Sequence, residues 1–434
     1  MPSGASCCEQ EWMRTHPDIV VYIPQVSAGQ DETNQHFNVI ATESGAFLAT
    51  WTSATREADP NQRVLCSRST DRGRTWSPPQ VIDGATPHDP PGVGMASWQF
   101  LIEARGVLPG GGSRTWCFYN KNVGIDDARA ADTGVMRCRW SDDEGVTWSS
   151  ETRDYKIEPN AISSPDPNVP PTWIVYQNPS TTPERAVLAG FTRWASNAVD
   201  PGVGMLERHS EVCFLRFENI LREADPDRLV VTTWPKSPHG LQAASPLREG
   251  VSVAQEPTVQ PFSDGRLITV FRTLTGKLYF ALSDDDGRTW DEPRPLRYEP
   301  GGEPVLNPCA PAPLYKLSDG RFLLLYYNND GSGHGGAGPT DAANVRNPAW
   351  IAIGREIPGE TEQPIRFGRP RIFADTGWVA VPGTSRTQVA TYSSLVEDRG
   401  ERIIFYPDRK HYLLGKRLSD EWLAQCDPEH GGGL

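Results

Sequence analysis

One eight-residue pattern, S-x-D-x-G-x-T-W, constrains the fold of this chain more than any other feature. It occurs three times, at residues 69–76, 141–148 and 283–290. The aspartates at its third position, Asp71, Asp143 and Asp285, lie 72 and then 142 residues apart, which is one spacing followed by almost two. A period of about 71 residues indicates a repeat protein, and a chain of 434 residues would hold about six such units.

Each copy of the pattern predicts the turn of a β-hairpin. It follows a short run rich in apolar, β-branched or aromatic residues, which is typical of a strand. The aspartate can accept hydrogen bonds from backbone N–H groups, the glycine supplies a positive φ and the tryptophan packs beneath the turn. We call each copy an Asp box and interpret it as a structural staple that marks a unit, because it carries no chemistry of its own.

We therefore predict an all-β chain that folds as a six-bladed β-propeller with Asp-box repeats. The propeller is expected to span residues 18–420, between an N-terminal segment of residues 1–17 and a C-terminal tail of residues 421–434. Within it, the run Ile19–Tyr22 is expected to serve as an outer strand that closes the ring.

Three cysteines support the same register. Cys66 and Cys138 each lie five residues before a box aspartate, and Cys213 lies 75 residues after Cys138, where a unit with a degenerate box is expected. A buried thiol behaves as a small apolar group, so we interpret these cysteines as core residues. Eight cysteines in 434 residues, with no paired CxxC spacing, predict neither a disulfide scaffold nor a metal site.

Charge and hydropathy exclude two classes of partner. A formal net charge of −13 argues against binding to nucleic acid or to an anionic membrane. The apolar runs are too short to span a bilayer. The N-terminus has no basic stretch followed by an apolar core, so we expect a cytoplasmic protein, or a secreted or periplasmic one if a leader has been removed. No cofactor is expected, since the boxes lack the spacing of an EF-hand.

The propeller geometry predicts where a site would lie. The boxes lie on one face, whereas the loops between second and third strands and the starts of the innermost strands open on the other face, around the central channel. Polar residues at those positions are the candidates. They are Arg56, Glu57, Asp59, Arg63, His88, Asn120, Lys121, Asp126, Asp127, Arg129, Arg193, Glu256, Arg272, Asn307, Asn328, Asn329, His334, Arg346, Tyr392, Glu397, Arg409, Lys410 and His411.

A resemblance to a known family narrows this list of candidate site residues. The boxes, the pairing of Glu256 with Arg272, Arg346, and the stretch Tyr392–Leu395 resemble the sialidase superfamily of six-bladed propellers, over about residues 22–416. In that family three arginines bind the substrate carboxylate, a tyrosine is the nucleophile with a glutamate as its base, and an aspartate is the acid/base.

The resemblance implies a role for five residues. Tyr392 matches the nucleophile, Glu256 its partner, Arg272 and Arg346 two of the arginines, and Asp59 the acid/base. These residue types suit the chemistry, since a neutral tyrosine oxygen approaches the charged anomeric centre of a sialoside with less repulsion than a carboxylate would. A tyrosine of pKa ~10 needs a base, and planar guanidinium groups bind a carboxylate through two hydrogen bonds. Further substrate contacts are expected from Arg56, His88, Asn329 and Arg409.

One departure from the family changes the expected substrate. Sialidases carry one of the three arginines in an R-I-P motif of the first strand, and this chain reads Tyr22-Ile23-Pro24. The loss of one arginine is expected to cost roughly a few kcal/mol of carboxylate binding. The substrate is therefore expected to be a different acidic sugar, or a neutral one, in a changed pocket.

We predict a sialidase-like, exo-acting glycoside hydrolase that removes a terminal acidic sugar from a glycan. Two other classes stay open. A polysaccharide lyase would use His88, His334, His411 or Tyr392 as base and acid, with arginines that neutralise a uronate. A noncatalytic carbohydrate-binding propeller would bind glycans without turnover.

Overall fold

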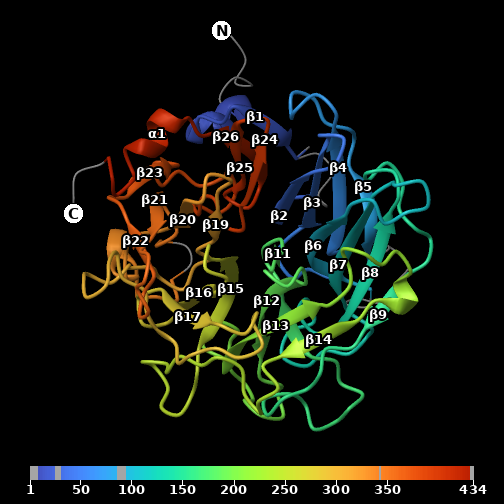
Figure 1. The fold of residues 1–434 in the computed structure, drawn as a ribbon, viewed down its shortest axis with the longest axis horizontal. Helices are drawn as coiled ribbons and strands as arrows, with labels where there is room; N and C mark the ends of the chain where they lie inside the picture. Colours follow the sequence, from blue (N-terminus) through green and yellow to red (C-terminus); the bar gives the residue numbers. More distant parts are fainter. Residues whose placement is uncertain (1–7, 25–30, 86–93, 342–343, 431–434) are drawn as a thin grey trace.

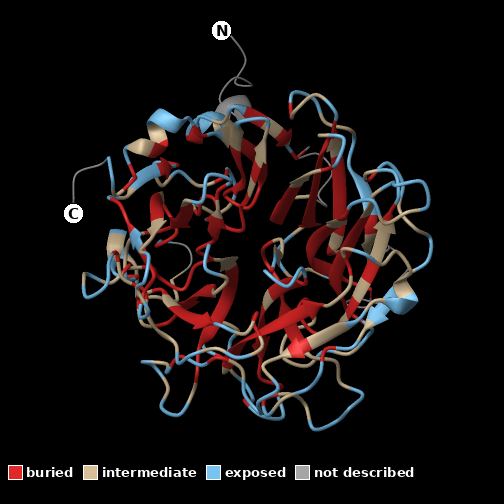
Figure 2. Ribbon diagram, viewed as in Figure 1, coloured by how far each residue is buried: buried red, intermediate tan, exposed pale blue. Residues whose placement is uncertain are grey.

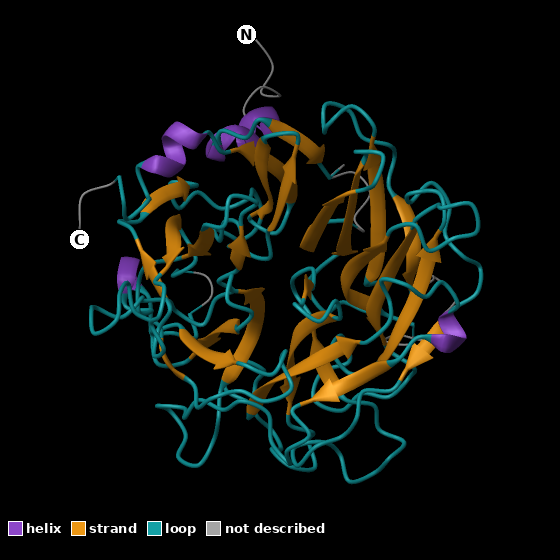
Figure 3. Ribbon diagram, viewed as in Figure 1, coloured by secondary structure: helices purple, strands orange, loops and turns teal. Residues whose placement is uncertain are grey.

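The computed structural model describes residues 8–24, 31–85, 94–341 and 344–430. Within them, six β-sheets stand around a central axis (Figure 1), which confirms the prediction of an all-β six-bladed propeller. Helices in this part of the chain are short and lie at the periphery (Figure 3), and none is long and apolar enough to cross a membrane. They are the 3₁₀ helices η1 (Cys8–Thr15), η3 (Pro226–Arg228) and η4 (Gly333–Gly335), and the α-helix α1 (Asp420–Ala424).

Each of blades one to five takes its strands in chain order from the channel outwards, with antiparallel neighbours. Blade one contains β2 (Thr33–Ala41), β3 (Phe47–Ala54), β4 (Arg63–Ser69) and β5 (Gln80–Gly84). Blade two contains β6 (Ala96–Ala104), β7 (Arg114–Lys121), β8 (Val135–Ser141) and β9 (Arg153–Tyr155). Blade three contains β10 (Thr172–Ile174), β12 (Val187–Trp194), β13 (Ser210–Phe217) and β14 (Val231–Trp234), with β11 (Ser180–Thr181) paired to β12. Blade four contains β15 (Ala254–Pro261), β16 (Leu267–Thr273), β17 (Tyr279–Ser283) and β18 (Arg294–Pro295). Blade five contains β19 (Leu314–Lys316), β20 (Phe322–Tyr326), β21 (Ala349–Glu356) and β22 (Ile365–Phe367), with β23 (Arg371–Ala374) paired to β21.

Blade six joins the two ends of the chain. It contains β24 (Ser394–Asp398), β25 (Glu401–Asp408) and β26 (Tyr412–Arg417), and its fourth strand is β1 (Ile19–Tyr22). Ile19 pairs with Gly415 in antiparallel register. The prediction that Ile19–Tyr22 is an outer closing strand is confirmed, and this pairing ties the first blade to the last.

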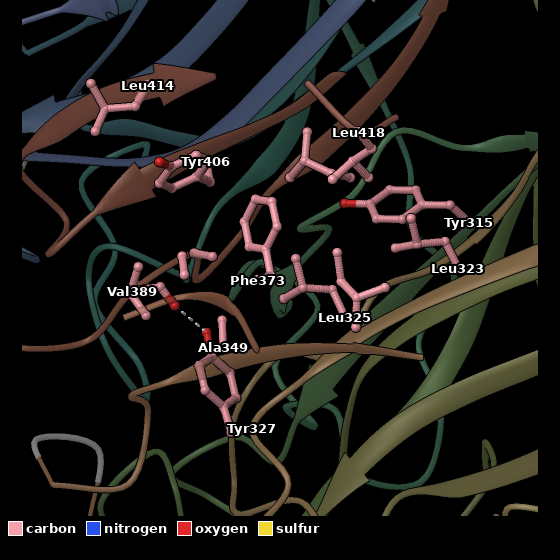
Figure 4. Close-up of a cluster of buried hydrophobic side chains, with 14 of the residues drawn as sticks. Tyr315, Leu323, Leu325, Tyr327, Ala349, Phe373, Val389, Tyr406, Leu414 and Leu418 are labelled. Carbon is pink, nitrogen blue, oxygen red and sulfur yellow. Dashed lines mark hydrogen bonds between the residues drawn. The ribbon is translucent and has the colours of Figure 1, made fainter. Parts of the chain in front are cut away.

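The core lies between neighbouring blades. The strands are buried along most of their length while the connecting loops are exposed (Figure 2). Between blades five and six, Leu325 shares one apolar cluster with Tyr406 and Leu414 (Figure 4). In the same cluster, Tyr327 Oη donates a hydrogen bond of 2.8 Å to the carbonyl oxygen of Val389. Because each sheet packs against the next, no blade has a core of its own.

The aspartate of an Asp box organises its own turn. In the third box, the Asp285 carboxylate accepts hydrogen bonds from the backbone N–H groups of Arg288 (3.1 Å) and Thr289 (2.7 Å). It also accepts from the hydroxyls of Ser283 (2.9 Å) and Thr289 (2.6 Å). The box residues thus act as the predicted staple.

The tryptophan and glycine of a box also join blades to one another. Trp290 of blade four stacks on Phe214 of blade three, with ring centres 4.4 Å apart. The box glycine of the same turn, Gly287, has φ +85°, and a Cβ there would lie 2.5 Å from Leu188 of blade three. Glycine is therefore required both by the backbone conformation and by the close approach of the neighbouring blade.

Replacing Asp285 by alanine tests the staple. Asp285→Ala is expected to lower the free energy of unfolding by about 1–3 kcal/mol, because the turn loses the charged acceptor of four of its hydrogen bonds. The neighbouring Asp284 is exposed, so Asp284→Ala removes the same charge and is expected to change stability by no more than about 0.5 kcal/mol. Urea unfolding measures both, and equal effects would contradict the structural role of the box aspartate.

Candidate functional site

An unusual backbone conformation recurs where the innermost strands begin. His36, Trp98, Glu256 and Tyr392 have φ values of 54°, 56°, 52° and 65°, in blades one, two, four and six. Positive φ is uncommon outside glycine. The strand pairing is irregular at the first three of these residues, as expected of a β-bulge, which redirects a side chain.

Three of these four residues line a pocket of about 250 Å³: Trp98, Glu256 and Tyr392. The loops that join second to third strands add charged side chains, and the β16 strand adds one more. The Asp boxes follow the third strands, so they lie at the opposite ends of the blades. The remaining lining residues are Glu57, Arg129, Ile174, Trp194, Met205, Leu206, Arg272, Arg346, Gln388 and Lys410.

A buried chain of polar contacts runs through three of the lining residues. Tyr392 Oη donates a hydrogen bond of 2.9 Å to Glu256 Oε1. Glu256 Oε2 lies 2.7 Å from Arg272 Nη1. Burial and the charge of Glu256 hold the pKa of Tyr392 well above its ordinary value. The phenol is therefore protonated at neutral pH, and its proton points at a carboxylate.

Two further lining residues carry unused hydrogen-bonding capacity. Arg346 Nη2 donates to the carbonyl oxygen of Cys309 at 2.5 Å, but Arg346 Nε has no hydrogen-bond partner among the described residues. Gln388 Oε1 is likewise buried and unpartnered within the described part of the chain. Buried polar atoms without partners are rare in folded proteins. These atoms mark positions at which a polar ligand would bind.

A second ion pair, Lys410 and Glu57, lines the same pocket. Lys410 Nζ lies 2.6 Å from Glu57 Oε2 and 5.6 Å from the ring centre of Tyr392. Arg129 pairs with the buried Asp132, whose other oxygen accepts a 2.6 Å hydrogen bond from the Trp98 indole. Burial favours a neutral Glu57, but the charges of Lys410 and Arg129 outweigh it and lower the pKa of this carboxyl.

The pocket has the opposite charge to the chain as a whole. Four cationic side chains line it against two carboxylates, whereas the chain carries a formal net charge of −13. A local excess of positive charge in a concave, partly desolvated site attracts an anionic ligand. Among the described residues, no group of three or more His, Cys, Asp or Glu side chains is arranged to hold a metal ion.

The structure brings together four of the nine residues for which the sequence analysis predicts a role in catalysis or substrate binding. Tyr392, Glu256, Arg272 and Arg346 all line this pocket. Asp59, the expected acid/base, does not line it, whereas Glu57 of the same loop does. Glu57 was among the wider set of candidates, but loop residues have no periodicity that would single it out.

The other expected substrate contacts lie elsewhere. Arg56 is exposed and does not line the pocket. Asn329 braces its own loop, since its Nδ2 donates to two backbone carbonyls at 3.0 Å each. Arg409 is fully buried and pairs with Asp408 at 2.9 Å. His88 lies outside the described residues.

Tyr22 does not occupy a position in the pocket. It lies on β1, the outermost strand of blade six, where its ring centre is 5.5 Å from that of Trp51. The innermost strand of blade one is β2, and the residue at its bulge is His36. Burial lowers the pKa of His36 well below its ordinary value, so this residue is neutral. The motif comparison predicts that Tyr22 replaces an arginine of the site, but the strand order places Tyr22 on the outermost strand of blade six.

Sequence reasoning missed the apolar wall of the pocket and Gln388. Trp98, Trp194 and Met205 contribute to this wall. Trp98 opens a predicted innermost strand, which was a usable signal. Met205 and Gln388 lie in irregular segments whose path the sequence does not define.

Comparisons with known proteins agree with this architecture. A family profile described as a BNR repeat-like domain matches residues 45–400. A search of curated proteins gave no match.

Similar solved structures include two enzymes and one protein of unknown function. A Hadza microbial sialidase is 15% identical with a TM-score of 0.59, over 90% of this chain and 66% of that one. A leech intramolecular trans-sialidase, solved with 2,7-anhydro-Neu5Ac, is 16% identical with a TM-score of 0.59, over 94% and 71%. A Dyadobacter fermentans protein of unknown function is 16% identical with a TM-score of 0.55, over 93% and 97%. At such identities the likeness establishes the fold.

The buried pair of Arg272 and Glu256 can be tested by a double-mutant cycle. Arg272→Met is expected to lower the free energy of unfolding by about 3 kcal/mol, because it leaves the Glu256 carboxylate buried without its counter-charge. The double variant with Glu256→Gln is expected to lose less than the sum of the two single losses. Urea unfolding of the four proteins gives the coupling energy, and additive losses would contradict a direct pair.

Proposed function

Since this chain belongs to the BNR repeat-like domain family, we propose that it is a sialidase-like, exo-acting glycoside hydrolase that removes a terminal acidic sugar from a glycan. The observation that carries the proposal is the 2.9 Å hydrogen bond from Tyr392 Oη to Glu256 Oε1 inside a pocket with an excess of cations. A nucleophile that donates its proton to an adjacent base is the arrangement that covalent catalysis requires.

Tyr392 is the proposed nucleophile. Its raised pKa keeps it neutral, so it can approach an anomeric centre that carries a carboxylate without charge repulsion. As the oxygen bonds to the anomeric carbon, its proton passes to Glu256. Arg272 holds the Glu256 carboxylate from its other oxygen, which fixes the acceptor in the geometry of transfer.

Arg272 and Arg346 are the proposed carboxylate-binding residues. Both are buried at the pocket wall, and guanidinium groups bind carboxylates with strong charge-assisted hydrogen bonds. The unpartnered Arg346 Nε is a donor that a ligand would satisfy. A pocket of about 250 Å³ is slightly smaller than typical ligand sites, which favours one terminal sugar over an internal segment of a chain.

Glu57 is the proposed acid/base, in place of Asp59, and it takes up the proton for the leaving group after it separates from Lys410, whose charge lowers its pKa. Glu57 lines the pocket and Asp59 does not. Its side chain is partly exposed, so it can exchange protons with solvent. The second step of a retaining hydrolysis needs the same group to accept a proton from water.

The alternative as a lyase receives less support from the geometry. Of the three histidines considered for it, His88 lies outside the described residues, and His334 and His411 do not line the pocket. His411 Nδ1 lies 2.6 Å from the carbonyl oxygen of Glu32. A noncatalytic binding role would not require the hydrogen bond between Tyr392 and Glu256.

Turnover of 4-methylumbelliferyl glycosides, sialosides included, together with acidic oligosaccharides, tests the proposal. The wild type is expected to release the fluorophore from an acidic sugar, and Tyr392→Phe to lower kcat/KM by about 10²- to 10⁴-fold. The matched control is Tyr406→Phe, which removes a buried hydroxyl of the same blade that lies 2.8 Å from Thr15 Oγ1, and it should retain activity. An unsaturated product that absorbs in the ultraviolet, or glycan binding without turnover, would overturn the proposal.

A further inference from the structure

We propose that Lys410 is a third cation that binds the carboxylate of the acidic sugar. In the empty pocket Glu57 pairs with Lys410, and the ligand carboxylate replaces Glu57 on binding. The inference rests on the function proposed above and adds to it the group that completes recognition of the anion. It concerns blades six and one, which meet at this side of the pocket.

The backbone at Lys410 is held in the left-handed conformation, which is strained for a residue other than glycine. Arg409 and Lys410 have φ values of 55° and 51°, in a tight turn where the His411 N–H donates to the Asp408 carbonyl at 3.0 Å. Turns with two successive left-handed residues favour Asn and Gly. Arg409 is anchored by its pair with Asp408, and Lys410 faces the pocket instead. Strain kept at a binding surface points to a role for the side chain that it positions.

The Lys410 ammonium is placed to meet an anion beside the nucleophile. Its side chain is 6% exposed, and Nζ lies 5.6 Å from the ring centre of Tyr392. Burial lowers the pKa of Lys410, and the charge of Glu57 opposes that fall. A buried ammonium requires a counter-charge, whether it comes from the protein or from a ligand.

Glu57 is an exchangeable counter-charge, unlike the other carboxylates near the pocket. Its side chain is 37% exposed, on the loop between β3 and β4, whereas that of Glu256 is 1% exposed. A partly solvated carboxylate can leave its partner for water at low cost. Arg129, by contrast, is bound to Asp132, whose side chain has no exposed surface. Of Arg129 and Lys410, Lys410 is therefore the cation that a ligand can bind.

Blade one provides no cation of its own at its bulge. His36 stacks on Trp98 with ring centres 3.4 Å apart, and burial keeps it neutral. A carboxylate bound by Arg272 and Arg346 would thus find its third positive charge on Lys410 of blade six. When the ligand carboxylate replaces Glu57, the net charge around Lys410 is unchanged, and Glu57 becomes free to approach the leaving group.

Calorimetric titration with two acidic sugars and their neutral esters tests this exchange. Sialic acid and glucuronic acid are each compared with the methyl ester, on the wild type, Lys410→Met, Lys410→Gly and Glu57→Gln. Both Lys410 variants are expected to weaken binding of the acid at least about tenfold and to leave the ester unchanged, because only the acid uses the charge. Lys410→Gly also relieves the left-handed backbone, so it separates the loss of the ammonium group from the backbone strain that Lys410→Met retains.

Glu57→Gln is expected to act in the opposite direction on binding. Loss of the competing carboxylate should tighten binding of the acid several-fold, while kcat of the hydrolase falls. A residue that only supports the fold would weaken acid and ester alike. The matched controls are Lys416→Met, a half-buried lysine whose Nζ donates to the carbonyls of Thr15 and Phe373 at 3.1 Å each, and Glu43→Gln, an exposed carboxylate on the β2–β3 turn.

The outcomes separate this inference from the function on which it rests. If the wild type binds an acid in preference to its ester and the Lys410 variants bind it equally well, the role of Lys410 is overturned and the hydrolase proposal stands. If the wild type binds neither acid, the function itself fails and the inference falls with it. Tighter binding by Glu57→Gln with weaker binding by Lys410→Gly supports the exchange.

Discussion

The site depends on one feature of the backbone, a residue in the left-handed conformation at the point where an innermost strand begins. The bulges at Glu256 and Trp98, and the matching conformation at Tyr392, place these three side chains on the wall of one pocket in the channel. Such residues are strained, and the strain is sustained because each blade is fixed by its neighbours through box tryptophans, glycine contacts and the closing strand β1. The rigidity of the ring is what allows groups from different blades to meet within hydrogen-bonding distance.

The pocket contains two ion pairs that differ in how easily their partners can separate. Arg272 and Glu256 are both buried and face each other at 2.7 Å, so neither can leave without exposing a buried charge. Lys410 and Glu57 are as close, but one partner is partly solvated. The first pair maintains the geometry of the nucleophile, and the second leaves room for a ligand to exchange with the protein. An acidic protein can thereby present a cationic pocket.

Sequence patterns predicted the ring and much of the site, and the failures have physical causes. The boxes mark third strands because aspartate and glycine must satisfy a fixed turn, and Glu256 and Tyr392 were found because strand starts converge on the channel. The resemblance points to Asp59 and not to Glu57 because the acid/base of the family is an aspartate, and the direction of a side chain on an irregular loop follows no sequence period. Arg409 was preferred to Lys410, although neighbouring residues of a tight turn point in different directions. Bulges leave no clear trace in composition, so His36 went unnoticed.

Peptide mass spectrometry after acid quenching tests whether the Tyr392 oxygen forms the bond to the sugar. During turnover of an activated acidic glycoside, one sugar is expected on the peptide that contains Tyr392. The same peptide of a Glu57→Gln protein should carry more of it, because release of the sugar needs that carboxylate. Substrate consumption with no adduct, or with the sugar on another residue, would contradict the account.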